Sequence, residues 1–187
     1  MSYVIGIAGG TAGGKSTFTE KLADSLDGLC VKVLHMDSYY KAETDRPHVA
    51  SHINGNVYMD DNCPECIDLD RFVVDLSDAV ESNCDVVIAE GLFVLHDERI
   101  KNKLSLKLFV DCPADERIVR RIRRNAEWGQ SFDTVTDVYL NMVRFRHEQY
   151  VEPTKWVADL IINGSGDTSD AVQLLAGHVK CKLLRKN

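Results

Sequence analysis

Residues 9–17 read Gly9-Gly10-Thr11-Ala12-Gly13-Gly14-Lys15-Ser16-Thr17, and this stretch decides the fold. It follows an apolar run at residues 3–8 and precedes a helical pattern at about 15–26. The spacing G-x-x-x-x-G-K-[ST] between a strand and a helix is typical of a phosphate-binding P-loop. Glycines let backbone N–H groups turn inward around an anion, and the N-terminus of the following helix adds its positive end.

The rest of the chain alternates apolar runs with helical patterns. The runs lie at residues 3–8, 30–35, 85–89, 106–110 and 158–162, and the helical patterns at 15–26, 68–82, 96–103, 114–127, 132–150 and 168–184. Runs that are apolar throughout indicate strands buried on both faces, hence a parallel sheet. The sequence therefore predicts an α/β fold of three layers with a five-stranded parallel sheet, in a single P-loop domain spanning 1–187.

Composition limits the partners. The chain has 22 basic and 29 acidic residues, a formal net charge of −7. Such a chain is a poor general binder of nucleic acid or membrane surfaces, so any anionic ligand needs a local cluster of donors. No signal peptide and no apolar stretch of about 18 residues is evident. Several of the six cysteines lie in apolar runs, which indicates buried free thiols. We expect a cytoplasmic protein with small-molecule partners and no nucleic-acid or membrane partner, and homo-oligomers stay open.

The P-loop implies a nucleotide and a metal ion. We expect ATP to be bound by Gly9, Gly10, Thr11, Ala12, Gly13, Gly14, Lys15, Ser16 and Thr17. Lys15 is expected to contact the β- and γ-phosphates, and the Ser16 hydroxyl to ligate Mg²⁺. The guanine signature N-K-x-D and the switch string D-x-x-G of GTPases do not occur.

Acidic residues follow two of the expected strands. Asp37 follows the second and Glu90 the third, and ligands bind at the carboxyl ends of parallel strands. We expect Glu90 and Asp37 to help hold Mg²⁺, and Asp37, beside the P-loop, to accept the proton of an attacking hydroxyl. A role for Asp37 as a turn former stays open. Tyr39 and Tyr40 are either core residues or the wall of the acceptor site.

A helix at 114–127 carries five arginines. At 3.6 residues per turn, Arg117, Arg120, Arg121 and Arg124 share a face and Arg123 points elsewhere. One reading is a solvated face paired with acids. The other is a mobile lid, at about 117–133, whose guanidinium groups neutralise a transferred phosphate, with Arg121 and Arg124 catalytic alongside Lys15 and Asp37.

Taken in order, these pieces resemble the phosphoribulokinase/uridine kinase family, and within it the uridine kinases most. The matching strings include Asp37-Ser38-Tyr39-Tyr40-Lys41, Glu90-Gly91-Leu92-Phe93, Arg120-Arg121-Ile122-Arg123-Arg124 and Glu152-Pro153-Thr154-Lys155. They span nearly the whole chain in the family's order. The resemblance implies ATP with Mg²⁺, the 5′-hydroxyl of a nucleoside such as uridine or cytidine as acceptor, and Asp37 as base. Residues 164–167 would border the adenine.

The chain departs from that pattern on the acceptor side. Uridine kinases have a base-reading hairpin in the interval that here, from Asp68 to Asp85, holds one helix and little else. The ribose-binding Asp falls on Asn62, with Asp61 next to it as a substitute, and a base-binding Gln falls on Val138. The lid string R-G-R reads Trp128-Gly129-Gln130. Another riboside, such as nicotinamide riboside, or a small polyol therefore stays open as acceptor.

Two further alternatives remain. Cys63 and Cys66 form one C-x₂-C, and His48 and His52 lie upstream, so the four could supply zinc ligands, although small-residue packing is the simpler interpretation. His147 is expected on the surface. A non-catalytic nucleotide-binding regulatory protein and a nucleotide hydrolase are the rival classes of function.

Overall fold

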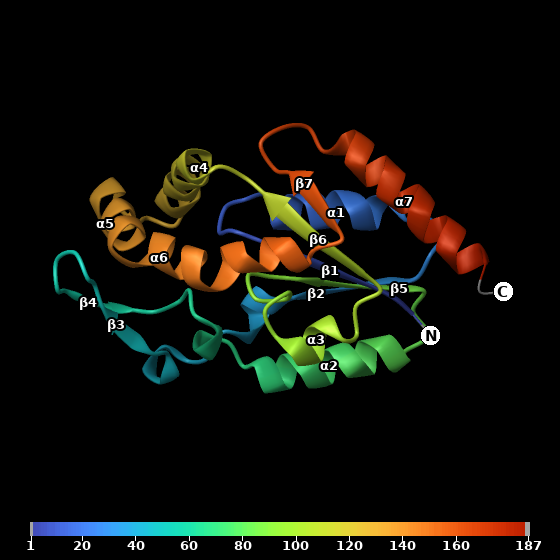
Figure 1. Cartoon of the computed structure of the whole chain (residues 1–187), viewed down its shortest axis with the longest axis horizontal. Coiled ribbons are helices and arrows are strands. Elements are labelled where there is room, and N and C mark those ends of the chain that lie inside the picture. Colours follow the sequence, from blue (N-terminus) through green and yellow to red (C-terminus); the bar gives the residue numbers. More distant parts are fainter. Residues whose placement is uncertain (1, 186–187) are drawn as a thin grey trace.

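Five parallel strands form the central sheet, in the order β2-β5-β1-β6-β7 (Figure 1). This computed structural model describes residues 2–185. The strands of the sheet are β1 (Tyr3–Gly9), β2 (Val31–His35), β5 (Val86–Glu90), β6 (Leu106–Asp111) and β7 (Leu160–Asn163). Every residue of β1 and β5 is buried, because each of these strands has a neighbour on both edges and helices on both faces. All five predicted strands are confirmed, with ends shifted by one or two residues.

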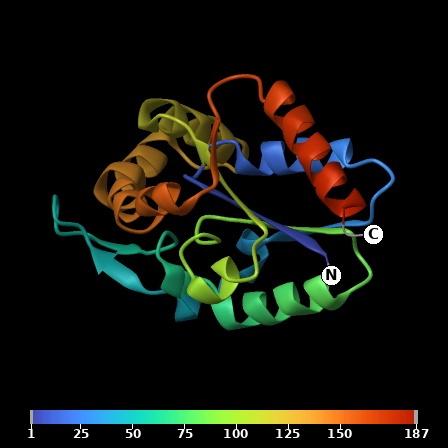
Figure 2. The same ribbon diagram turned by 45° about the vertical axis from the view of Figure 1, so that its right-hand side comes forward.

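Helices cover both faces of the sheet, which confirms the predicted three layers (Figures 1 and 2). α1 (Lys15–Ser25) and α7 (Ser169–Leu184) lie on one face, and α2 (Leu69–Glu81) and α3 (Glu98–Lys101) on the other. On the first face the buried apolar side chains include Phe18, Leu22, Val172 and Leu175. On the second they include Phe72, Leu76, Phe93 and Ile100. The helix predicted at 96–103 is present but shorter, since α3 spans only Glu98–Lys101.

The helices after β6 stand at the carboxyl end of the sheet. They are α4 (Ala114–Glu127), α5 (Phe132–Val138) and α6 (Arg144–Arg146), with π-helical segments at Tyr139–Val143 and His147–Val151 and a 3₁₀ segment at Glu152–Val157. The single helix predicted at 132–150 is therefore interrupted twice. Extra residues in a π-helical turn shift the side chains that follow, and π-helical turns often occur at functional sites.

A two-stranded antiparallel hairpin precedes α2 and was not predicted. It consists of β3 (His48–Ala50) and β4 (Val57–Met59), which lie near α5 in Figure 1. Strands of three residues are too short to show a period of two. The turn contains Asn54-Gly55, with φ of 74° at Gly55, and this pair is a strong local hairpin signal that the sequence analysis missed. The interval from Asp68 to Asp85 holds α2 and a short connection, as predicted.

The hairpin packs on the helices beyond α4. The Tyr58 hydroxyl donates a hydrogen bond to Asp137 Oδ2 at 2.8 Å. Val49 and Tyr58 also pack against a buried cluster formed by Tyr139, Met142 and Val143. The segment between β2 and α2 is thereby attached to α5 and to the π-helical segment Tyr139–Val143.

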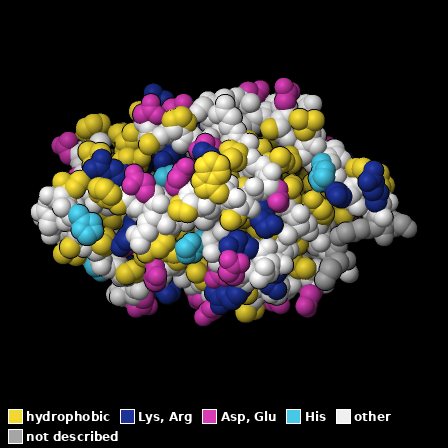
Figure 3. All heavy atoms as spheres, viewed as in Figure 1, with side chains coloured by type: hydrophobic (Ala, Val, Ile, Leu, Met, Phe, Trp, Pro, Cys, Tyr) yellow, Lys and Arg dark blue, Asp and Glu magenta, His cyan; other side chains and the backbone are white. Residues whose placement is uncertain are grey.

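Two general features complete the fold. Within residues 2–185, no helix combines the length and the apolar character needed to cross a membrane. Basic and acidic side chains are interspersed on the face drawn in Figure 3. All six cysteines are free. Cys63, Cys66 and Cys112 are buried as expected, Cys84 is half-buried, and Cys30, which precedes the edge strand β2, and Cys181 are exposed. The Cys30 thiol lies close to a second cysteine. Its Sγ lies 2.7 Å from that of Cys84.

Candidate active site

The loop between β1 and α1 has a backbone that requires glycine. Gly9 has φ of 149°, and a Cβ there would collide with the carbonyl oxygen of Val110 in β6. Gly14, the N-cap of α1, has φ of 94°, in the left-handed region. These two conformations turn the loop tightly around the N-terminus of α1. Backbone N–H groups at such a helix start favour a phosphate group.

Lys15 and Glu90 lie at the base of this loop. The side chain of Lys15 is 10% exposed, and its Nζ donates to the carbonyl oxygen of Gly10 at 3.1 Å and lies 3.9 Å from Glu90 Oε1. Glu90 Oε2 accepts a hydrogen bond from Ser16 Oγ at 3.4 Å and lies 2.9 Å from His35 Nδ1. His35 was not predicted, because only the pairing of β2 with β5 brings it opposite Glu90.

The oxygens at this position suit a magnesium ion. Mg²⁺ is usually held by one or two carboxylates together with substrate phosphates. Ser16 Oγ and Glu90 Oε2 are adjacent, and Ser16 and Asp37 line one pocket. In the described part of the chain no three His, Cys, Asp or Glu side chains form a group arranged to hold a metal alone. The donor set therefore fits an ion that takes its other ligands from phosphate and water.

The strand order corrects one expectation about Asp37. β5 lies between β1 and β2, so Glu90, and not Asp37, directly adjoins the P-loop strand. Asp37 lies in the 3₁₀ turn Met36–Tyr39 that follows β2, is exposed, and lines a pocket of about 660 Å³ together with Lys15 and the loop. Asp37 therefore does not adjoin the P-loop directly, but both line the same pocket.

Tyr39 and Tyr40 point in different directions. The Tyr39 hydroxyl donates to Asp75 Oδ2 at 2.7 Å, and its ring packs edge-on against Phe72 at 5.0 Å between centroids. Tyr39 is therefore a core residue and is not among the residues that line the pocket, which corrects its predicted role in substrate binding. Tyr40 does line the pocket, and its hydroxyl donates to the carbonyl oxygen of Asp61 at 3.0 Å. Burial and the nearby Asp37 carboxylate raise the pKa of Tyr40, so it stays a neutral phenol.

Asp61 and Asn62 both line this pocket, as expected of acceptor-binding residues. Asp61 Oδ1 accepts a hydrogen bond from Arg46 NH1 at 3.0 Å, and the Arg46 guanidinium lies 4.9 Å from the centre of the Tyr40 ring. Asn62 is 7% exposed. Arg46 also lines the pocket and was missed, because no motif marks it.

A buried ion pair fixes the segment that carries Asn62. Asp60 is 1% exposed, and its Oδ2 lies 2.6 Å from Arg146 Nε on α6. Its Oδ1 accepts a hydrogen bond from the backbone N–H of Asn62 at 3.1 Å. Removing one partner of such a pair leaves a buried charge uncompensated, so Asp60 and Arg146 act as a unit.

Three arginines of α4 face the pocket. Arg120 NH1 donates to the carbonyl oxygen of Gly164 at 2.9 Å, and Arg121 NH1 donates to Thr11 Oγ1 at 3.0 Å. Arg124 lies one turn further and also lines the pocket. Arg123 is exposed on the other side of the helix, as the periodicity predicts. Arg120 NH2 also lies 3.0 Å from Glu116 Oε2, so the alternative of a face paired with acids describes Arg120 in part, whereas Arg121 bonds to the P-loop.

The arginines carry unused donors. Arg121 Nε and Arg117 NH1 are buried and have no hydrogen-bond acceptor among residues 2–185. Burial and the adjacent Arg124 guanidinium lower the pKa of Arg121. Buried donors are nearly always satisfied in native proteins, so each of these groups requires an explanation. Arg121 also lines the pocket, so a phosphate bound there would meet its guanidinium group.

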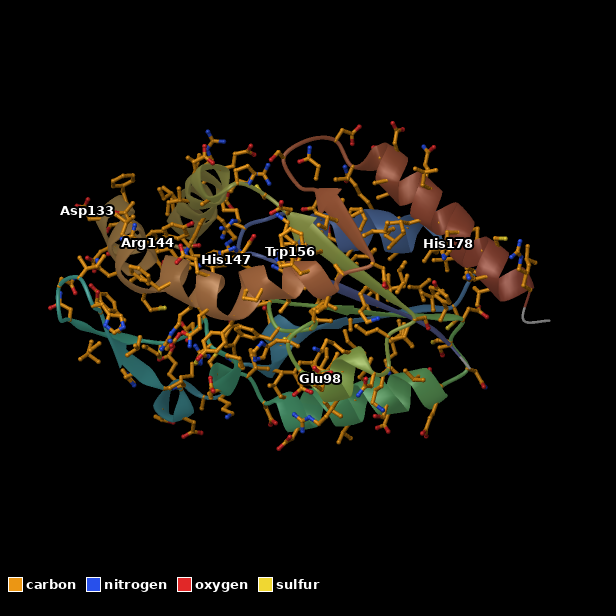
Figure 4. All side chains as sticks on the ribbon, viewed as in Figure 1. Glu98, Asp133, Arg144, His147, Trp156 and His178 are labelled. Atoms are coloured by element: carbon orange, nitrogen blue, oxygen red, sulfur yellow. The ribbon has the colours of Figure 1, made fainter. Side chains whose placement is uncertain are left out.

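His147 is not the surface residue predicted. Its side chain is 11% exposed on the helical segment behind the pocket, where Figure 4 places it close to Arg144. Its Nε2 lies 3.1 Å from Glu152 Oε2. Burial, followed by the positive charge of Arg117, lowers the pKa of His147 to about 4. The imidazole is therefore neutral at physiological pH.

The two cysteines and two histidines considered as zinc ligands differ in their surroundings. Cys63 and Cys66 are buried in the core against α2, whereas His48 and His52 are exposed on the hairpin. None of them belongs to a metal-binding arrangement in the described residues. The cysteines fill the core, which is the simpler of the two interpretations.

The sequence of this chain is similar to proteins of one known family. The model of the phosphoribulokinase/uridine kinase family matches residues 68–170. The chain belongs to the phosphoribulokinase/uridine kinase family. It is 34% identical to the uridine kinase of Clostridium botulinum (strain Kyoto / Type A2), over 95% of each chain. It is 30% identical to that of Limosilactobacillus reuteri (strain DSM 20016), over 98% of this chain and 93% of the other. The chain is thus an ATP-dependent phosphotransferase of this family.

Solved structures show the same fold. A "possible uridine kinase" from Bacillus stearothermophilus superposes with a TM-score of 0.57 at 17% identity, covering 86% of this chain and 88% of the other. A shikimate kinase from Acinetobacter baumannii has a TM-score of 0.54 at 16% identity, with coverages of 100% and 96%. At these identities the likeness concerns the P-loop kinase fold.

Proposed function

We propose that this enzyme transfers the γ-phosphoryl group of ATP to the 5′-hydroxyl of a nucleoside, with uridine and cytidine as the first candidates. One observation carries the proposal: Asp37, Lys15 and the loop residues Thr11–Thr17 line the same pocket. A phosphate donor at the loop would thus face a carboxylate across the pocket. The family relationship to uridine kinases supports a nucleoside as the acceptor.

The donor side consists of the P-loop and the strand-end acid. Residues Gly9–Thr17 would bind the phosphates of ATP through backbone N–H groups, and Lys15 would contact the β- and γ-phosphates. Ser16 and Glu90, with Asp37 across the pocket, would hold Mg²⁺, which supplies charge neutralisation on the phosphate oxygens when bound. His35 would keep the Glu90 carboxylate oriented through their 2.9 Å contact.

The acceptor side performs the proton transfer. Asp37 accepts the proton of the acceptor hydroxyl as the hydroxyl oxygen bonds to the γ-phosphorus of ATP. The bond from the γ-phosphorus to the β,γ-bridging oxygen breaks at the same time, and ADP leaves. Arg121 and Arg124 donate to the phosphoryl oxygens as negative charge shifts toward ADP. Tyr40, Asp61 and Asn62 surround the acceptor. Residues 117–133 act as the lid.

A second acceptor class has an observation in its favour. The connection from α2 to β5 is too short to contain a base-reading hairpin, and Asn62 stands in the pocket where uridine kinases have a carboxylate. A pocket without buried base-specific donors discriminates mainly by size and stacking, by about 10–200-fold per feature. Another riboside, such as nicotinamide riboside, or a small polyol is therefore the alternative acceptor.

One experiment tests the function. ADP release is followed with ATP and Mg²⁺ in the presence of uridine, cytidine, adenosine, nicotinamide riboside or simple sugars, each compared with a sample without acceptor. The proposal expects release that requires a nucleoside. Release without any acceptor would indicate a hydrolase, and no release with any compound would indicate a regulatory nucleotide-binding protein.

The proposed reaction also indicates a cellular location and a class of partners. We place the reaction in the cytoplasm, because ATP and nucleosides are its reactants and all six cysteines are free thiols. Small molecules rather than nucleic acid or membranes are the proposed partners, in line with the net charge of −7.

A further inference from the structure

Trp128 lines the substrate pocket although most of its side chain is exposed. It is the C-cap residue of α4, and 66% of its surface is accessible. A single exposed aromatic residue is normal on a protein surface and by itself means little. Trp128 differs because it lies at the mouth of the pocket that also contains Asp37 and Lys15.

The orientation of Trp128 follows from its place on α4. At about 100° per residue, a side chain seven residues after Arg121 points within about 20° of the same direction, whereas it is about 80° away from Arg120. Arg120 donates to Gly164, while Arg121 donates to Thr11 and lines the same pocket as Tyr40 and Asp61. Trp128 therefore lies on the same side of α4 as Arg121, and it lines the pocket that Tyr40 and Asp61 also line.

A neighbouring cation fixes the indole. The Arg124 guanidinium lies 5.0 Å from the centre of the Trp128 ring, a distance at which cation–π attraction is effective. The guanidinium occupies one face of the ring, and the exposure of 66% shows that much of the remainder is accessible. A rigid aromatic face with one side held and one side accessible can stack on a planar ring.

We propose that Trp128 is a specificity-determining residue that stacks on the planar base of the acceptor nucleoside. The inference rests on the proposed function, since it assigns the acceptor's base to the side of the pocket beyond Arg121. Stacking accepts any planar ring, because every base has a π-face. Trp128 thus favours ribosides with an aromatic base over polyols, and discriminates little between uridine and cytidine.

Steady-state kinetics provide the first test. Trp128→Ala should lower kcat/KM for uridine by about 5- to 150-fold, the range found when a stacking aromatic is removed. The loss should appear in the KM of uridine, with the KM of ATP unchanged. Trp128→Phe, which keeps a smaller aromatic face, should recover part of the loss.

A substrate pair isolates the stacking. 5,6-Dihydrouridine keeps the ribose, the 5′-hydroxyl and both base carbonyl groups, but its base is neither aromatic nor planar. The wild type should prefer uridine to dihydrouridine, and Trp128→Ala should remove most of that preference. An equal loss on both substrates would show that Trp128 merely closes the lid, and would overturn the inference.

Fluorescence provides a binding test that does not depend on turnover. The chain has two tryptophans, and Trp156, 80% exposed, lies outside the pocket lining, at the other end of the helical segment from α5 (Figure 4). In Trp156→Phe the only indole is Trp128, and uridine should quench it with the same affinity with which it binds. In the matched variant Trp128→Phe, the Trp156 signal should not change.

The outcomes separate the inference from the proposed function. Nucleoside-dependent ADP release without quenching, or with unchanged uridine kinetics in Trp128→Ala, overturns the inference and leaves the function standing. A rise in the KM of ATP alone would place the indole against adenine and also overturns it. If no nucleoside is either bound or turned over, the proposed function is overturned, and the inference with it.

Discussion

Lys15 is held in place before any nucleotide arrives. Its Nζ donates to Gly10 and lies 3.9 Å from Glu90, so the ammonium group points into the loop at little further entropic expense. Lys15→Ala should lower turnover by roughly 100-fold or more, because an oriented charge stabilises the transition state by several kcal/mol. Lys21→Ala, which removes an exposed lysine of the same helix, is the matched control and should leave kcat unchanged. Near-normal kcat in Lys15→Ala would contradict the role of the loop.

Asp37 is exposed in the pocket. Asp37→Asn keeps the size of the side chain but cannot accept a proton, so kcat should fall by about 10²–10⁴-fold. The affinity for ATP, measured by calorimetry, should change much less. Asp45→Asn, in the exposed 3₁₀ turn Glu43–Asp45, serves as control. Lost ATP binding with intact turnover at saturation would make Asp37 a nucleotide ligand and not the base.

His147 makes the stability depend on pH. Its pKa is lowered to about 4 in the folded protein from 6.5, so between these values the unfolded chain binds the proton more readily. The contribution of His147 to the free energy of unfolding is therefore complete above about pH 6.5 and is lost as pH falls toward 4. From pH 7 to pH 5 the loss from this group is at most about 2 kcal/mol. Urea unfolding of wild type and His147→Phe should show the smaller pH dependence in the variant.

The matched control for that measurement is His52→Gln on the hairpin. His52 is exposed, so this variant should follow the wild-type pH dependence. An unchanged pH dependence in His147→Phe would show that the imidazole titrates as it does in water.

At the scale of elements, α4 provides its own internal comparison. Arg124 lines the pocket, and Arg123 beside it is exposed on the other side. Arg124→Lys keeps the charge but loses the planar pair of donors that matches phosphate oxygens. We expect a clear fall in kcat, about 10-fold or more, for Arg124→Lys and unchanged kinetics for Arg123→Lys. Equal kinetics in the two variants would favour a solvated face.

The β3–β4 hairpin connects the two sides of the pocket. Arg46 precedes it, and Asp61 and Asn62 follow it, so both of its ends lead to pocket residues. Its Tyr58 bonds to Asp137 in α5, beyond the lid. If residues 117–133 move as the proposed lid, the hairpin gives that movement a packed route to Arg46, Asp61 and Asn62.

At the scale of the whole molecule, nucleotide binding should stabilise the fold. A ligand that binds only the folded state at 100 times its Kd adds about 2.7 kcal/mol, which raises Tm by about 5–10 °C for a chain of this size. ATP with Mg²⁺ should produce this shift in a thermal melt of the wild type and of Lys21→Ala. Lys15→Ala should show a much smaller shift at the same ATP concentration. An undiminished shift there would place the nucleotide elsewhere.

The sequence predicted the sheet and the strand–loop–helix unit of the P-loop well. The apolar runs identify strands that are buried on both faces, and the P-loop is a local strand–loop–helix unit. The helical period correctly separated Arg123 from the arginines that face the pocket. Each of these features depends on residues close together in the chain, so the sequence alone contains the necessary information.

The acceptor side could not be predicted in the same way. Tyr39 and Tyr40 are adjacent, and only the packing of α2 shows that the first is a core residue and the second a pocket residue. The Asp60–Arg146 pair joins residues 86 positions apart, and no local pattern announces it. The buried setting of His147 has the same origin, because the packing around its helical segment decides its exposure.

The sequence by itself determined that this protein has a parallel α/β fold with a phosphate-binding loop, acids at two strand ends and an arginine-rich helix, because local spacing and hydrophobic pattern specify these features. Only the tertiary structure decided that β5 separates β1 from β2, which places Glu90 next to the loop and Asp37 across the pocket. It also decided that Trp128 lines that pocket. Both depend on the order in which distant segments pack, and that order is set by burial of the whole core.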